Sequence, residues 1–184
     1  MIPAQLSLLQ RSFASIEPRA DEFGAFFSER LFAIAPDMKA LLRADSEAQQ
    51  PKSVTVLAEF ARLHLRAMIS LPATAQTSGE AVLPGAYWSG RLHAAYGVRM
   101  EDFDKMKVAL VWALQQTLRD EFTPEVAEAW ALAYDIVARA MQSGMKSNAD
   151  DEREPESNMQ IRLNQIGEVE DGAEVFRKIV GDWP

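Results

Sequence analysis

The sequence contains no cysteine and only two histidines, His64 and His93. Without cysteine there are no disulfides, thiolate metal sites or thiol catalysis, and such a composition suits a reducing, cytoplasmic location. Two histidines exclude any metal or catalytic site built on several of them. Neither has neighbours typical of a Ser-His-Asp triad, and no GxGxxG or GxxxxGK[ST] nucleotide loop occurs.

Long apolar runs and clustered positive charge are also missing. No apolar run approaches the roughly 20 residues that span a membrane, and no secretory signal opens the sequence, so we expect no membrane association. The net charge of −8 argues against a nucleic-acid partner, which needs clustered Lys and Arg. Residues 150–184 hold ten acidic and four basic residues, so most of the negative charge lies in this last segment.

What the sequence does contain is helical periodicity. Before residue 150, apolar residues recur at spacings of three and four, and strand-like alternation of useful length is missing. Thr123 before Pro124 predicts a capped helix start, and Gly97 predicts a helix end. The pattern therefore predicts an all-α fold of about seven helices. The first helix is expected at residues 6–13, the second ends near Pro36, and a short third runs from Pro36 to Leu42. The fourth is expected from Pro51 to Leu71, the fifth at 81–94, the sixth at 100–119 and the seventh from Pro124 onward.

The composition changes near residue 147. Residues 147–158 combine Ser, Asn, acidic residues and Pro155, which is typical of a flexible linker. We therefore expect a helical domain over residues 1–147 and an acidic, partly disordered C-terminal extension over residues 148–184. Within that extension, Ala173–Val180 is a candidate short helix.

Taken alone, neither histidine indicates a ligand site. His93 lies near a predicted helix end, where histidine usually satisfies carbonyls or favours the helix dipole. His64 lies late on the fourth predicted helix and is expected to be a partly exposed helix residue. The aromatic residues are more often core than cofactor contacts.

Four stretches, taken in order, resemble bacterial single-domain globins and the globin domain of flavohemoglobins. They are Phe26–Phe32 with Ala35-Pro36-Asp37, Gln50-Pro51-Lys52, Leu83-Pro84 followed by His93 and Gly97-Val98, and Phe122–Glu125 leading to Ala129–Tyr134. The resemblance covers about residues 5–146 and leaves the tail without a counterpart. It implies a globin-like helical fold with a C-terminal extension, and a bound heme b.

On the proximal side, the resemblance makes His93 the ligand of the heme iron. The other nitrogen of its ring should be held by a backbone carbonyl about one turn earlier, near Ser89. Leu92 and Val98 are expected to contact the heme, and so is Phe103.

On the distal side, the resemblance assigns Gln50, whose amide would donate a hydrogen bond to bound dioxygen. Gln49 is the alternative if the register slips by one residue, and Gln50 pointing to solvent is a third reading. Val54 should face the heme one turn later. Phe27 stands where many relatives carry a distal tyrosine, and Leu42 stands where the family usually has a phenylalanine stacked on the heme.

Two further departures concern activity. Relatives that act as nitric-oxide dioxygenases carry a tyrosine and a glutamate behind the histidine, at positions that match Phe103 and Met145. Their loss favours simple ligand binding. Lys52, Arg91 and Arg99 are candidate partners of the heme propionates.

The sequence thus predicts reversible binding of dioxygen or another diatomic gas, as in oxygen transport. Three alternatives stay open. They are a sensor that signals through the tail, a heme enzyme acting on nitric oxide or peroxide, and a scaffold without heme. A reductase is a candidate partner, and both a monomer and a homodimer are compatible with the sequence.

Overall fold

The computed structural model describes residues 1–41, 64–66, 68, 69 and 84–150. Every regular element in this part of the chain is helical, as the periodicity predicts. The helices are α1 Pro3–Ile16, α2 Ala20–Ile34, α3 Met38–Leu41, α5 Pro84–Ala95, α6 Asp102–Leu118 and α7 Pro124–Asp150, with 3₁₀ turns at Glu17–Arg19 and Arg119–Glu121. Residues 64–66, 68 and 69 are helical as well. None of the helices described here is both long enough and apolar enough to cross a membrane.

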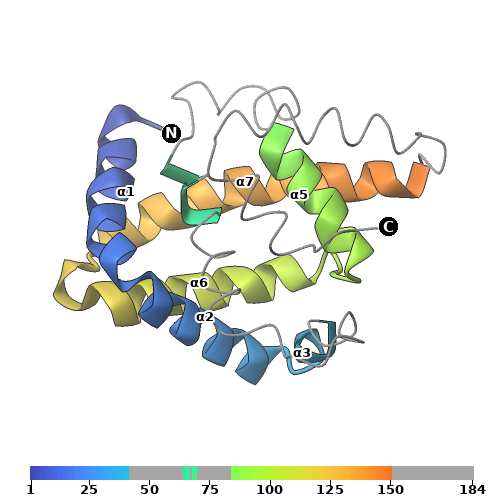
Figure 1. The fold of residues 1–184 in the computed structure, drawn as a ribbon. Helices are drawn as coiled ribbons and strands as arrows, with labels where there is room; N and C mark the ends of the chain where they lie inside the picture. Colours follow the sequence, from blue (N-terminus) through green and yellow to red (C-terminus); the bar gives the residue numbers. More distant parts are fainter. Residues whose placement is uncertain (42–63, 67, 70–83, 151–184) are drawn as a thin grey trace.

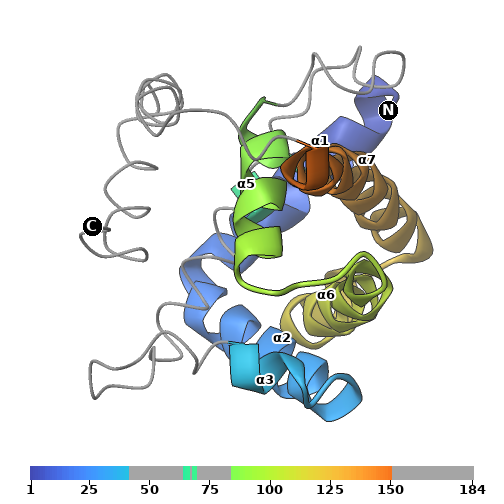
Figure 2. The ribbon, with the colours of Figure 1, turned by 90° about the vertical axis from the view of Figure 1, so that its right-hand side faces the viewer.

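Helices α5 and α1 pack on α7, and α2 packs on α6 (Figure 1). A view turned by 90° shows α6 and α7 nearly end-on, with α5 lying against α7 (Figure 2). His93 lies in the last turn of α5, where its ring is near that of Phe103 in α6, and Gly90 one turn earlier faces Met141 of α7. The all-α fold expected from the sequence is confirmed.

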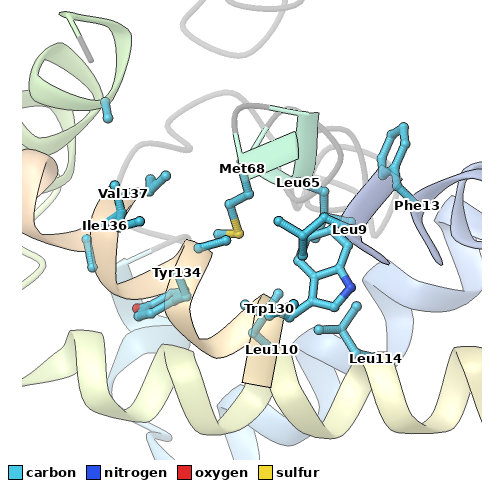
Figure 3. Packing of buried hydrophobic residues seen from close by; sticks show 14 of the residues in the cluster. Leu9, Phe13, Leu65, Met68, Leu110, Leu114, Trp130, Tyr134, Ile136 and Val137 are labelled. Carbon is cyan, nitrogen blue, oxygen red and sulfur yellow. The ribbon is translucent and has the colours of Figure 1, made fainter. Parts of the chain in front are cut away.

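The core lies between α1, α6 and α7 (Figure 3). Trp130 of α7 is fully buried against Leu9 and Leu114. Its indole N–H donates a hydrogen bond to Ser12 Oγ at 2.9 Å, and the Ser12 hydroxyl lies 2.8 Å from the Leu8 carbonyl. Burial of an indole is favourable only when its N–H finds such a partner, so this contact fixes α1 on α7.

Two helix boundaries predicted from the sequence are confirmed. The Thr123 hydroxyl accepts a hydrogen bond from the Val126 N–H at 3.4 Å, and Pro124 opens α7. Gly97 has a φ of 83°, a left-handed conformation that other residues rarely adopt. The Val98 N–H then returns to the carbonyl of His93 at 3.0 Å, which closes the end of α5.

The linker predicted to start at residue 147 does not start there. Helix α7 continues through Asp150, so the first four residues of the segment 147–158 are helical. Met141 and Met145 are still buried on this last part of α7, and extending an existing helix adds one backbone hydrogen bond per residue without a new nucleation cost. The division into a domain over 1–147 and an extension over 148–184 stays a prediction, and residues 151–184 lie outside the described part.

Candidate functional site

His93 occupies the last turn of α5, close to its end at Ala95. The residue is only 7% exposed, so it is more deeply buried than histidine usually is. The turn at Gly97 fixes the backbone that follows it. A buried imidazole held at a rigid helix end is well suited to act as a ligand, because its direction does not vary.

The hydrogen bond of His93 determines its tautomer. Nδ1 lies 2.7 Å from the Ser89 carbonyl oxygen, one turn earlier on α5. A carbonyl can only accept, so Nδ1 carries the proton and Nε2 keeps its lone pair. This confirms the bond to a backbone carbonyl near Ser89 that the resemblance implied.

The surroundings of His93 also keep it neutral. Burial, reinforced by the nearby His64, lowers the pKa of His93 to about 4, although the hydrogen bond to Ser89 acts to raise it. At neutral pH the ring is therefore an uncharged nitrogen donor. A neutral imidazole is the form that binds iron, so the residue present fits a heme.

His64 is the second imidazole at this place. Its Nε2 lies 3.2 Å from Ser89 Oγ, and its ring meets that of His93 edge-on, at a centroid distance of 5.6 Å and an angle of 78°. No sequence pattern connects the two histidines, because they lie 29 residues apart and His64 is flanked by Leu63 and Leu65. Only the packing of the helical residues 64–66 against α5 brings them together.

Phe103, at the start of α6, is the aromatic neighbour of His93. Their ring centroids lie 6.3 Å apart at an angle of 39°. The Phe103 carbonyl accepts a hydrogen bond from the Tyr134 hydroxyl at 2.7 Å. Burial, helped by Asp104 and Asp135, raises the pKa of Tyr134, so its phenol stays protonated and able to donate. The expected position of Phe103 next to the histidine agrees with this geometry.

Helix α5 lies unusually close to α7 because two glycines face the opposite backbone. A Cβ added at Gly90 would lie 1.8 Å from the Met141 carbonyl oxygen, and one added at Gly144 would lie 1.9 Å from that of Tyr87. The sequence analysis did not predict this pair of glycines. The spacing of each glycine on its own helix carries no information about which backbone it meets.

The other expected heme contacts fall into two groups. Phe27 is partly buried and stacks on Phe23 at a ring centroid distance of 6.5 Å. Phe27 and the partly buried Val98 each pack against the core and against a second buried group, which consists of Leu31, Ala35, Met38 and Ala109. Leu92 is also partly buried. The distal candidates lie outside the described residues, namely Leu42, Gln49, Gln50 and Val54. The propionate candidate Lys52 lies outside them as well.

The turn between α5 and α6 is tied down by charges. Arg99 pairs with Asp37 and Glu101 at 3.0 Å each and with Asp102 at 3.4 Å. Asp102 is 1% exposed; burial acts to raise its pKa, but hydrogen bonds from the Arg99 backbone, from Lys105 and from the Arg99 side chain outweigh burial and lower it. A guanidinium that already meets three carboxylates is a weak candidate for a heme propionate.

Two more residues named from the sequence can be placed. Arg91 lies over the ring of Trp88 at 5.0 Å, a cation–π contact, and remains a candidate for a propionate. Met145 is buried in the core, and its side chain carries no carboxylate.

Comparison with known proteins adds an independent line of evidence. Residues 25–141 match the family model described as Globin, a range that contains both histidines and Phe103. The anaerobic nitrite reductase HBII of Casuarina glauca is 26% identical over 153 residues, covering 79% of this chain and 92% of that protein. Neuroglobins of Chaenocephalus aceratus and Dissostichus mawsoni are each 25% identical over 148 residues, covering 78% of this chain and 92% of theirs.

Proposed function

The chain belongs to the globin family, and from that premise we propose that it holds one heme b through His93 and that the heme would bind a diatomic gas. The heme supplies the iron that binds the gas. The protein supplies the proximal nitrogen, its orientation and apolar surroundings. Reversible binding of dioxygen is the function that these parts support best.

The observation that carries this proposal is the state of His93. Its Nδ1 is committed to the Ser89 carbonyl at 2.7 Å, its pKa is lowered to about 4, and its side chain is buried. The remaining nitrogen is thus an unprotonated donor of fixed direction. A histidine with a purely structural role at a helix end would usually be charged and partly exposed to interact with the helix dipole.

The residues behind His93 favour binding over catalysis. Phe103 contacts the histidine with an apolar ring, and Met145 is buried among apolar residues, so neither donates electron density through a polar contact. We propose that the distal side is completed by Gln50 or Gln49, with Phe27, Leu42 and Val54 as apolar neighbours. The four sequence stretches support a place among bacterial single-domain globins.

The test is ligand binding by the heme-reconstituted protein. The ferrous form should bind carbon monoxide and dioxygen reversibly, with one gas molecule per heme, and release dioxygen when the gas is removed. A ferrous form that binds neither gas would contradict the proposal.

A heme enzyme is the second candidate, because one relative is named as a nitrite reductase. Incubating the ferrous protein anaerobically with nitrite tests this candidate. In that reaction nitrite would take one electron from the ferrous heme and two protons from the buffer, giving nitric oxide and water and leaving the heme ferric. Formation of nitric oxide no faster than with free heme would leave gas binding as the function.

A further inference from the structure

Ser89 makes a polar contact with each of the two histidines. Its backbone carbonyl accepts from His93 Nδ1 at 2.7 Å, and its hydroxyl lies 3.2 Å from His64 Nε2. The two imidazoles therefore meet through a single residue, one bonded to its main chain and the other to its side chain. His64 reaches this place from helical residues 64–66, outside α5.

We propose that His64 is a positioning residue, which acts through the Ser89 hydroxyl to set the orientation of the His93 ring toward the heme iron. The proposal rests on the proposed function of His93. Nε2 of His64 contacts the Ser89 hydroxyl, so the proposal gives His64 no role as an iron ligand.

Three contacts limit the rotation of the His93 ring. The bond from Nδ1 to the Ser89 carbonyl fixes one edge, and Phe103 lies 6.3 Å away at 39°. The edge-on contact with His64 at 78° limits the third direction. Partners of this kind fix the tautomer and orientation of metal-bound histidines.

The bond between His64 and Ser89 matters because Ser89 is the residue whose carbonyl holds His93. Without the hydroxyl contact the His64 side chain can turn away from Ser89, and the edge of its ring then leaves His93. The ring of His93 can then tilt, which weakens the iron–nitrogen bond. Removing such an outer partner typically costs about 10-fold to 100-fold in metal affinity.

Four variants of the heme-loaded protein test the proposal. His64→Leu and Ser89→Ala remove the contact from either side, and Ser89→Ala keeps the backbone carbonyl that accepts from His93. His64→Gln keeps a side chain that can bond to the hydroxyl. Ser28→Ala is the matched control, since the Ser28 hydroxyl is buried but donates to Gly24 within α2.

The main readout is the iron–histidine stretching frequency of the ferrous protein, measured by resonance Raman spectroscopy. It should fall in His64→Leu and Ser89→Ala, and stay close to the parent value in His64→Gln and Ser28→Ala. In the double variant of His64→Leu with Ser89→Ala the frequency should shift no further than in either single variant, because the two substitutions remove the same contact. Heme loss to a scavenger should be about ten-fold faster in the same two single variants.

The outcomes that overturn the proposal are distinct. An unchanged frequency in both His64→Leu and Ser89→Ala would show that the contact does not position His93. A fully additive double variant would show that the two residues act separately. A six-coordinate ferrous parent that loses its sixth ligand in His64→Leu would show that His64 binds the iron. If instead the parent takes up no heme, the proposed function fails and not this inference.

Discussion

Gly90→Ala should strongly destabilise the protein, because Gly90 faces the backbone of another helix. The added Cβ would lie 1.8 Å from the Met141 carbonyl oxygen and 2.5 Å from its carbonyl carbon. Contacts of a Cβ below 3.0 Å are essentially never found. The obstacle is main chain within α7, so it cannot rotate out of the way as a flexible side chain would.

The magnitude follows from the displacement needed. Helices α5 and α7 would have to separate by roughly 1 Å, which breaks close packing along their whole contact, and overpacking of this kind costs about 1–3 kcal/mol. Because the neighbour is backbone, we expect a loss near the upper end, about 3 kcal/mol in the free energy of unfolding. His93 lies three residues further along α5 and should move with it, so heme release should be faster as well.

Urea unfolding of the heme-loaded protein measures this loss. Gly85→Ala is the matched control, since Gly85 lies on the same helix and has nothing within 4 Å of the added Cβ. Alanine there should be neutral or stabilising by up to about 1 kcal/mol. If Gly90→Ala unfolds at the same urea concentration as Gly85→Ala, the close approach of α5 to α7 is wrong.

Two further predictions concern His93 and Tyr134. The pKa of His93 in the folded, heme-free chain is about 4, below its ordinary value of 6.5. Between these two values the unfolded chain binds a proton at His93 and the folded chain does not. The free energy of unfolding should fall by about 3 kcal/mol between pH 6.5 and pH 4, measured with urea at each pH. That component should be missing in His93→Phe, and an equal slope in the variant would refute it. Tyr134→Phe leaves the Phe103 carbonyl without its partner and should cost about 1–3 kcal/mol in the same assay; a loss below 0.5 kcal/mol, roughly, would contradict the role of that bond.

Local features of the fold could be predicted from the sequence because local physics determines them. The spacing of apolar residues marks the buried face of each helix, and the Thr123 hydroxyl and Gly97 determine where α7 begins and α5 ends. The bond between His93 and Ser89 follows from one turn of helix once His93 is taken as a ligand. Each of these needs only a few neighbouring residues.

Long-range features could not be predicted in this way. Periodicity shows that a helix has an apolar face but not which helix that face meets, so the approach of Gly90 to α7 was missed. The contact of His64 with Ser89 likewise depends on how two helical segments pack. The composition of residues 147–158 indicated a linker, although the buried face of α7 carries the helix through Asp150.

The most direct test of the account is the absorption spectrum of the ferrous and carbon-monoxide forms of the reconstituted protein. We predict one heme per chain with an intense Soret band that shifts when carbon monoxide binds. His93→Ala should lose stable heme, with recovery when imidazole is added, and His64→Ala should keep its heme. Stable heme with an unchanged carbon-monoxide spectrum in His93→Ala, or a parent protein without a Soret band, would contradict the assignment of His93 as the heme ligand.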